Sequence, residues 1–338
     1  MGKVYIQTIE GLGPRLRLTH LATRRPENRT LVKESVALFS DWKKLIVSDC
    51  DAVVIAAPAA LHAEMTRACL EAGKPCIVEK PLCFDTATAQ ALQREAARAG
   101  LPVLVNYIHL YNPAVQALKK AIAASGEPIR VILSEGTDLG PFRADVGTLW
   151  DRCPHDVALC LDLIGATAPE TSWRTEAGAG GSAATRLCAE ASAFGGFADP
   201  QGRPEMITLR LRWKDGAAAW IQSGRLNPQK RRTLSVITDS HLFHFDDQDR
   251  SRCRRIPFDY AGRTGLGSGP LPKEGEPIPM PDRPAPMEAM LTAFADHVQG
   301  KATTAAIGLG LTVELTRILE QCQTQMERDP LSNSGEIR

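Results

Sequence analysis

The chain has 338 residues, which is long enough for two domains and a sizeable hydrophobic core. Its 40 basic and 39 acidic residues nearly cancel, which argues against a nucleic-acid-binding or membrane-surface protein. No apolar run approaches the roughly 20 residues of a membrane span, and the N-terminus carries no signal-peptide pattern. The nine cysteines are odd in number and form no C-x-x-C pair, so we expect neither a disulfide framework nor a zinc site, and no other metal centre is indicated. These features predict a reduced, cytoplasmic protein.

The segment from Val53 to Leu82 predicts a parallel β–α–β unit. Two short apolar runs rich in β-branched residues, Val53–Ala56 and Cys76–Val78, flank a stretch of helical periodicity. Ligands of open parallel sheets bind beyond the carboxyl ends of the strands, which here carry Ala57-Pro58 and Glu79-Lys80-Pro81. Because a proline disfavours the helical region for the residue before it, Lys80 is either a placed charge or an ordinary solvated lysine at a turn.

This segment resembles the signature region of the glucose–fructose oxidoreductase / inositol dehydrogenase / MocA family of NAD(P)-dependent oxidoreductases. In that family a strand ends in a proline, a histidine follows four residues later, a helix ends in Glu-Ala-Gly-Lys, and Glu-Lys-Pro comes next. The corresponding residues here are Pro58, His62, Glu71 to Lys74 and Glu79 to Pro81. The resemblance extends more weakly over nearly the whole chain. It implies cofactor-binding roles for Ala57, Pro58, His62, Glu79 and Lys80.

The beginning of the chain departs from the family pattern. Val4 to Leu12 has helical periodicity, and the resemblance places Met1 and Gly2 at the last two positions of the glycine-rich turn, with Gly2 as a cofactor contact. A dinucleotide-binding domain opens with a strand before this turn, so we expect the first strand and two of the three glycines to be missing from the chain as given. That loss would expose ladder groups of neighbouring strands and remove part of the pyrophosphate cradle. Either the start codon is assigned too late, which we favour, or the protein binds dinucleotide poorly.

The cofactor preference is predicted from the residues that end the next strand. An acidic residue here accepts hydrogen bonds from the adenosine ribose, as NAD requires, whereas this chain has Thr23 followed by Arg24 and Arg25. A hydroxyl and a guanidinium suit a 2′-phosphate, so the sequence predicts NADP as the preferred cofactor. NAD is the alternative cofactor. The alternative is that both arginines are ordinary turn charges.

A later strand, Val103–Tyr107, leads into His109, Tyr111 and a helix that begins at Pro113. The family usually has a polar, often basic, residue near the first of these positions and an aromatic residue before Asn-Pro. The resemblance therefore implies that His109 and Tyr111 face substrate. A packed histidine that satisfies local backbone groups is an equally good interpretation.

The segment around Asp151 and His155 leads into an apolar helix. Pro154 suits a first helical turn, so we expect Asp151 just before the helix and His155 within its first turn. The positive helix terminus disfavours imidazolium and would keep His155 neutral, as a base needs. On spacing alone, a capping Asp151 beside a packed His155 is the better interpretation. The D-x-x-x-H spacing resembles the family's catalytic motif, however, which implies a catalytic group of Lys80, Asp151 and His155.

Beyond Pro128 the pattern changes to alternating strands with hairpin turns. The basic cluster Lys230-Arg231-Arg232 is interpreted as solvated strand ends, and the Gly-, Ala- and Ser-rich stretch from Thr171 to Gly202 as a surface loop. The predicted fold class is α/β plus α+β: a Rossmann-type doubly wound parallel sheet without its first strand, then a domain on an open, mainly antiparallel sheet. The expected divisions are 1–125 for cofactor, 126–286 for substrate and oligomerisation, and 287–338 for helices that pack back on the first domain.

The leading hypothesis is an NADP-preferring oxidoreductase acting on a secondary alcohol or ketone of a sugar, cyclitol or nucleotide sugar. His155 would take the hydroxyl proton, Lys80 would stabilise charge on the oxygen, and Asp151 would orient His155. Arg143 is a candidate for holding a carboxylate or phosphate of the substrate. The resemblance implies a homodimer or homotetramer. The alternatives are a non-catalytic dinucleotide-sensing or partner-binding protein on the same fold, and a lyase or epimerase that holds its cofactor tightly.

Overall fold

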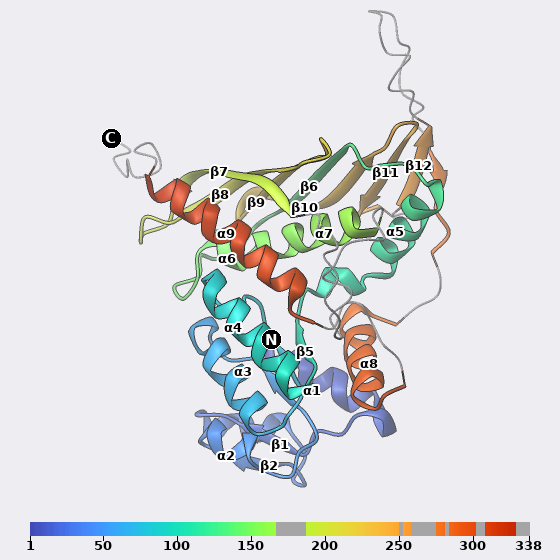
Figure 1. Ribbon diagram of the computed structural model, residues 1–338. Coiled ribbons are helices and arrows are strands. Elements are labelled where there is room, and N and C mark those ends of the chain that lie inside the picture. The colour runs from blue at the N-terminus through green and yellow to red at the C-terminus, as the bar shows by residue number, and fades with distance from the viewer. Residues whose placement is uncertain (167–186, 250–252, 258–274, 281–283, 302–307, 329–338) are drawn as a thin grey trace, which may run out of the picture. The chain divides into compact units, whose positions relative to one another are not determined.

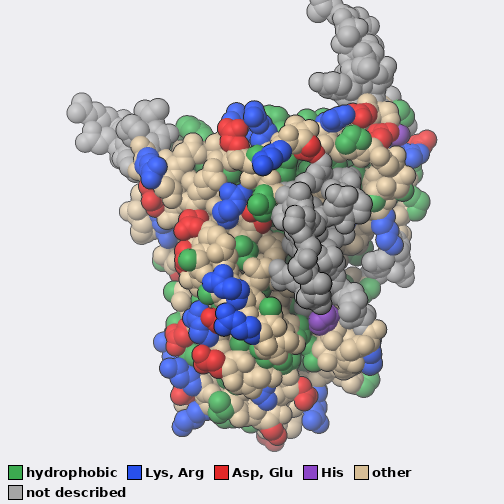
Figure 2. Space-filling view, viewed as in Figure 1, with side chains coloured by type: hydrophobic (Ala, Val, Ile, Leu, Met, Phe, Trp, Pro, Cys, Tyr) green, Lys and Arg blue, Asp and Glu red, His purple; other side chains and the backbone are tan. Residues whose placement is uncertain are grey.

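The computed structural model describes residues 1–166, 187–249, 253–257, 275–280, 284–301 and 308–328. These residues fall into two compact units (Figure 1). Unit 1 contains the described residues up to 111 together with 284–301 and 308–313, and unit 2 contains the others. No helix in these ranges is both long and apolar enough to cross a membrane. Acidic and basic side chains are intermingled on the face in Figure 2, in keeping with the near balance of charge.

Unit 1 begins directly with helix α1 (Gly2–Gly11), as the apolar spacing predicts. The buried residues Tyr5, Ile6 and Ile9 form one side of this helix, and no side chain caps its N-terminus. The helix ends where Leu12 N donates to Thr8 O at 3.1 Å. The sequence prediction that a helix, and not a strand, opens the chain is confirmed.

The strands of unit 1 are short, parallel and arranged in two sheets. Strands β1 (His20–Ala22) and β2 (Ala37–Phe39) pair with each other. Strands β3 (Val53–Ile55), β4 (Cys76–Val78) and β5 (Val103–Val105) form a second sheet in that order. In residues 1–166, which are described without a gap, no strand precedes α1. The expected Rossmann-type parallel arrangement without its first strand is therefore confirmed.

Helices enclose the three-stranded sheet because its strands are apolar on both faces, as parallel strands must be. On one face, Ile77 and Leu104 lie in register and pack with Tyr5 and Ile9 of α1 and with helix α8. Helix α3 packs against β3 and β4, and α4 packs against α3. The helices are α2 (Trp42–Ile46), α3 (His62–Glu71), α4 (Thr86–Ala99) and α8 (Pro286–Val298), with 3-10 helices at Gly13–Arg15, Pro26–Leu31, Ala59–Leu61 and Ile108–Tyr111.

Helix α4 shows how local signals set the element boundaries. The side chain of Asp85 accepts a hydrogen bond from Thr88 N at 2.7 Å, which satisfies a free amide of the first turn. Gly100 ends the helix in the left-handed conformation with φ of 64°, which glycine adopts without steric cost. Both ends of the helix are therefore set by residues within or next to it.

Unit 2 is built on one eight-stranded sheet with the order β13-β12-β11-β10-β6-β9-β8-β7. Neighbouring strands are antiparallel except for β6 and β9, which are parallel, so the expected mainly antiparallel sheet is confirmed. Its strands are β6 (Val131–Leu139), β7 (Cys188–Ala198), β8 (Pro204–Trp213), β9 (Ala218–Gly224), β10 (Leu226–Ile237), β11 (His241–Asp246), β12 (Cys253–Pro257) and β13 (Glu276–Pro277).

One predicted loop in this unit is wrong. The stretch from Thr171 to Gly202 contains β7, which pairs with β8 along nearly its whole length; residues 171–186 lie outside the described ranges. Small residues in this strand give no alternation of apolar and polar side chains. One of them, Gly195, lies where a Cβ atom would come within 2.6 Å of the Pro204 ring. The neighbouring strand therefore requires the short side chain that made the segment look like a loop.

Helices pack on one face of the sheet of unit 2 (Figure 1). Helix α7 packs against β6 and β9, α5 against β11 and β12, and α6 against β8. The helices of this unit are α5 (Pro113–Ser125), α6 (Thr148–Asp151), α7 (Cys153–Ala166) and α9 (Gly310–Arg328), the last from Glu314 onward. Since α5 belongs to this unit, the division after residue 111 differs from the predicted boundary after 125 by the length of that helix.

Candidate functional site

The residues that follow β3, β4 and β5 lie beside one another at the carboxyl edge of the sheet in unit 1. Glu79 N donates to Ile55 O at 2.9 Å, and Asn106 N donates to Val78 O at 2.8 Å. The pairing thus continues one residue beyond the ends of β4 and β5. It places Ala57-Pro58, Glu79-Lys80 and Asn106 at the edge where open parallel sheets bind their ligands.

His62 joins two of these loops. The ring is 1% exposed, with Nε2 2.9 Å from Ala57 O and Nδ1 2.7 Å from Pro81 O. Both partners are backbone carbonyls, so the histidine holds the turn after β3 against the Glu-Lys-Pro turn after β4. This position favours an indirect role in shaping the cofactor edge, and a direct contact between His62 and cofactor stays a prediction.

Glu79 belongs to a buried polar group of three residues. Asn106 Nδ2 donates to Glu79 Oε1 and to the Tyr5 hydroxyl, both at 2.8 Å. Burial, and then the negative charge of Glu79, raise the pKa of Tyr5. Among the described residues, Asn106 Oδ1 accepts no hydrogen bond although the side chain is buried. Sequence reasoning missed Tyr5 and Asn106; the available signal was a polar residue directly after β5, in the place that Glu79 has after β4.

Lys80 follows Glu79 at this edge and is partly exposed. The Lys80–Pro81 peptide bond is cis. Lys80 is therefore located beyond the carboxyl end of β4, as the sequence predicts, between a buried carboxylate and a proline that His62 contacts. Its catalytic role stays a prediction.

The residues of unit 1 fit a dinucleotide at several points. The N-terminus of α1 has no side-chain cap, Gly2 is exposed, and a Cβ atom there would have no neighbour within 4 Å, so a phosphate can approach the free amides. The orphaned acceptor Asn106 Oδ1 lies at the cofactor edge and suits an amide donor. At the end of β1, Thr23 Oγ1 accepts from Asn28 Nδ2 at 2.8 Å and from Arg25 N at 3.2 Å, and Arg24 and Arg25 are both exposed.

His109 and Tyr111 both lie in the 3-10 helix Ile108–Tyr111, and both are partly exposed. The Tyr111 side chain packs against the apolar cluster that α1 and α8 share, which favours a packing role for this residue. A substrate contact by either side chain stays a prediction.

Asp151 and His155 lie at the junction of two helices in unit 2. Asp151 is the last residue of α6, and His155 is in the first turn of α7, with its amide donating to Arg152 O at 3.1 Å. Asp151 is buried, whereas His155 is partly exposed. The expected order of an acid before the helix and a histidine in its first turn is therefore confirmed as structure, and their chemical roles stay predictions.

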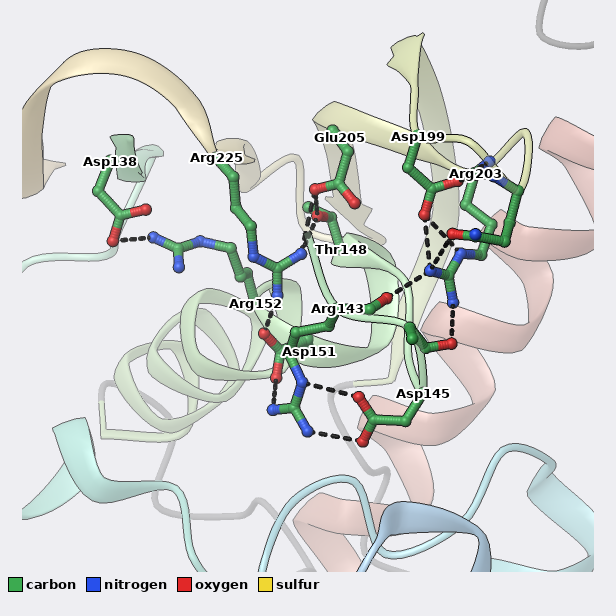
Figure 3. A network of polar contacts seen from close by, with 12 residues as sticks. Asp138, Arg143, Asp145, Thr148, Asp151, Arg152, Asp199, Arg203, Glu205 and Arg225 are labelled. Atoms are coloured by element: carbon green, nitrogen blue, oxygen red, sulfur yellow. Dashed lines mark hydrogen bonds and ion pairs between the residues drawn. The ribbon is translucent and has the colours of Figure 1, made fainter. Parts of the chain in front are cut away.

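Two guanidinium groups hold the Asp151 carboxylate (Figure 3). Arg143 Nη1 lies 3.0 Å from Oδ1, and Arg225 Nη2 donates to Oδ2. Arg225 is 3% exposed, and its other terminal nitrogen donates to Glu205 Oε2 at 3.0 Å and to Thr148 Oγ1 at 2.9 Å. The buried cation thus bridges two carboxylates, so its removal would leave both without their shared partner.

Arg225 reaches this position because Gly224 allows the chain to approach β8 closely. A Cβ atom at Gly224 would lie 2.7 Å from Glu205 O, to which Arg225 N donates at 3.1 Å. Sequence reasoning missed Arg225 and Glu205. An arginine directly after Gly at a strand end gives no pattern that distinguishes it from a turn charge.

Arg143 lies against Asp151 while its side chain remains 46% exposed. It also forms a two-pronged pair with Asp145, with Nη2 to Oδ2 at 2.7 Å, and the Arg143 hydrogen bonds lower the pKa of Asp145. Arg203, paired with Asp199, donates to the carbonyls of Arg143 and Ala144 and so fixes this loop (Figure 3). The structure therefore brings Arg143 to the predicted acid, and its binding of substrate stays a prediction.

The predicted site residues fall into groups within each unit. In unit 1, Ala57, Pro58, His62, Glu79 and Lys80 share one edge, whereas Gly2 begins α1 and Thr23 and Arg24 follow β1. In unit 2, Arg143 and Asp151 are bonded directly, with His155 one helical turn further on. Within the described ranges, no group of three or more His, Cys, Asp and Glu residues is arranged to hold a metal ion.

Unit 1 is thus a parallel-sheet unit with polar groups at its carboxyl edge, and unit 2 is built on a large open sheet. Residues 1–107 match the oxidoreductase family with the NAD-binding Rossmann fold. A crystal structure of a candidate oxidoreductase from Magnetospirillum magnetotacticum MS-1 is 31% identical, with 95% of both chains covered and a TM-score of 0.78. The chain therefore belongs to this oxidoreductase family, as the Glu-Lys-Pro segment predicts.

Two curated relatives extend the comparison. Myo-inositol dehydrogenase Hyg17 of Streptomyces leeuwenhoekii is 25% identical over 235 residues, which is 68% of each chain. UDP-N-acetylglucosamine 3-dehydrogenase of Acidithiobacillus ferrooxidans is 32% identical over 124 residues, which is 36% of this chain and 38% of the relative. With the family, these relatives establish that the protein is an NAD(P)-dependent oxidoreductase.

The buried position of Arg225 leads to a prediction about stability. Replacing it in Arg225→Met leaves the Asp151 and Glu205 carboxylates without their shared cation, so the free energy of unfolding falls by about 3–5 kcal/mol, measured by urea denaturation. The matched control is Arg210→Met, because Arg210 pairs with Glu190 at the surface with both side chains about half exposed. That change costs about 0–1 kcal/mol. Equal losses in the two variants would contradict the network's structural role.

Proposed function

We propose that this oxidoreductase transfers hydride between the nicotinamide of NADP and a secondary alcohol or ketone of a sugar, cyclitol or nucleotide sugar. The observation that carries the proposal is the junction of α6 and α7, where two guanidiniums hold Asp151 and a partly exposed His155 follows in the next turn. The two curated relatives are named as dehydrogenases of a cyclitol and of a nucleotide sugar, which supports this substrate class.

His155 is the proposed proton acceptor in the oxidative direction. The bound nicotinamide supplies the hydride acceptor when alcohol is oxidised and the hydride donor when ketone is reduced. The imidazole takes the hydroxyl proton as the carbonyl forms, and returns it in the reverse reaction. A placed base of this kind contributes about 10²–10⁴-fold to the rate. The partial exposure of His155 is compatible with access by substrate.

Lys80 is the proposed electrostatic group. Its ammonium would donate a hydrogen bond to the substrate oxygen and stabilise the negative charge that develops there. Asp151 would orient His155 or bind a neighbouring hydroxyl. Because Arg143 and Arg225 fix both of its oxygens, the Asp151 carboxylate has a single defined position from which to do so.

The proposed NADP preference rests on the turn after β1. Thr23 takes the position where an acidic residue would select NAD, and the exposed Arg24 and Arg25 follow it, which supports binding of a 2′-phosphate. One alternative is a partner-binding protein on the same fold. That alternative predicts that neither dinucleotide binds.

The test of catalysis is the variant Lys80→Met, which keeps much of the side-chain volume and removes the charge. We expect kcat to fall about 10²–10³-fold, as it does when one donor to a developing oxyanion is lost. Calorimetry should show that NADP still binds. The control Lys43→Met removes an exposed lysine of the same unit and should leave kcat unchanged. Near-normal turnover by Lys80→Met would remove this lysine from the mechanism, and absence of NADP and NAD binding by the unaltered chain would favour the alternative.

The test of cofactor preference is Arg24→Ala. Loss of a hydrogen bond to a charged phosphate costs about 1.5–3 kcal/mol, so the dissociation constant for NADP should rise roughly ten- to a hundredfold. The constant for NAD should not change. Arg98→Ala, which removes an exposed arginine in the last turn of α4, serves as the control. A clear preference of the unaltered protein for NAD would overturn this part of the proposal.

We also place the protein in the cytoplasm as a homodimer or homotetramer. All nine cysteines are buried and none is joined in a disulfide, as suits a reducing compartment. On the sheet of unit 2, Leu133 and Trp220 pair in register on β6 and β9 and are 44% and 43% exposed. An exposed leucine and tryptophan side by side on a sheet face support an interface there.

The variant Trp220→Glu tests this interface. A charge in the middle of the apolar pair should weaken association, so sedimentation analysis should show a smaller species than for the unaltered protein. Val47→Glu places the same charge at an exposed apolar position in unit 1 and should leave the mass unchanged. A monomeric unaltered protein, or an unchanged mass for Trp220→Glu, would contradict the proposed interface.

A further inference from the structure

The residue after His155 is a carboxylate that is bound from three adjacent strands. Asp156 is 0% exposed. It accepts hydrogen bonds from Ser134 Oγ on β6 at 2.8 Å, from Ser223 Oγ on β9 at 2.8 Å and from Arg232 Nη1 on β10 at 2.5 Å. Strands β10, β6 and β9 are consecutive in the sheet. One side chain in the first turn of α7 is therefore tied to three neighbouring strands.

Arg232 is part of this arrangement and not a solvated strand end, so the interpretation of the basic cluster from the sequence is wrong for this residue. Its side chain is 12% exposed and forms the ion pair with Asp156. The pair lies over Gly136 of β6, where a Cβ atom would come within 2.7 Å of both Arg232 Nη2 and Asp156 Oδ2. The strand thus leaves room for the ion pair only because a glycine lies beneath it.

Two buried thiols lie on the same helix as Asp156. Burial, and then the negative charge of Asp156, raise the pKa of Cys153 and of Cys160. Both cysteines are fully buried within α7. Arg232 is the cation that pairs with the Asp156 carboxylate, and the two serine hydroxyls complete its hydrogen bonds.

We propose that Asp156 is a positioning residue for His155. Apolar packing of α7 on the sheet is non-directional and permits small rotations and shifts of the helix. Hydrogen bonds from three strands are directional, so they fix the rotation and the height of the first turn. His155 is the adjacent residue in that turn, so fixing the turn also fixes the position of its imidazole. The inference rests on the proposed role of His155 as the base.

The test removes single donors and keeps the charges. In Ser134→Ala, Ser223→Ala and the double variant, Asp156 retains Arg232 but loses one or both hydroxyls. Gly136→Ala keeps every polar group and displaces the ion pair. Ser235→Ala is the matched control. The Ser235 hydroxyl is on β10 and lies 2.9 Å from His244 Nδ1 on β11, so it bonds to another residue than Asp156. Arg232→Met is less informative because it leaves a buried carboxylate without its cation and so destabilises the whole unit.

Two measurements are made on each variant. The first is kcat and KM with NADP and a sugar or cyclitol substrate. The second is the ¹H–¹³C resonance of His155, assigned by its loss in His155→Gln, which reports the imidazole environment without any turnover. We expect the double variant to lower kcat about tenfold with little change in KM, since a misplaced base is costly to the rate. Its His155 resonance should shift or broaden, whereas Ser235→Ala should alter neither.

The outcomes separate this inference from the proposed function. The His155 resonance could shift in the double variant while the unaltered protein turns over none of the sugars and cyclitols. That result would support the positioning role and overturn the proposed chemistry. An unchanged resonance and unchanged kcat in both the double variant and Gly136→Ala would overturn the positioning role and leave the chemistry standing. Equal effects from Ser235→Ala would show a general loss of stability and would also overturn it.

Discussion

The ion pair between Asp156 and Arg232 constrains much of unit 2. A carboxylate without exposure to water must be matched by donors, because its desolvation is otherwise prohibitive. Here the match requires a hydroxyl on β6, a hydroxyl on β9 and a guanidinium on β10, so the three strands and α7 must adopt one register relative to one another. A helix held only by apolar contacts would have several nearly equivalent positions, whereas this one has a single position that satisfies the charge.

The same constraint extends to the small residues of the strands. Gly136 lies beneath the Arg232 guanidinium, and Gly224 brings the chain of Arg225 against β8. Both glycines weaken their strands intrinsically, since glycine loses more conformational freedom than other residues on folding. They are required because a guanidinium and a close backbone approach occupy the space that a side chain would need. The buried cations thus determine residues that carry no chemistry of their own.

The sequence predicted the elements of unit 1 better than the polar contacts of unit 2 for a physical reason. Helix α4 is bounded by a capping Asp85 and by Gly100, and these signals lie within the helix's own neighbourhood. The partner of Asp151 in the buried pair, Arg225, is 74 residues away and follows no period. Arg232 stands among basic residues at 230 and 231 that are exposed, so composition alone could not show which cation turns inward. Local sequence patterns predict helices and strands. Ion pairs between distant residues can be identified only once the arrangement of the strands is known.

The proposed catalytic groups are each fixed by contacts inside their own unit. Lys80 follows a buried carboxylate and precedes Pro81, whose carbonyl is held by His62. His155 lies between Asp151 and Asp156, which are bound by different arginines. A hydride transfer tolerates little error in the position of its acid–base and electrostatic groups, and a group on a rigid element is placed more accurately than one on an unsupported loop. Buried charges cost stability unless they are paired, and in this protein two such pairs hold the carboxylates on either side of the proposed base.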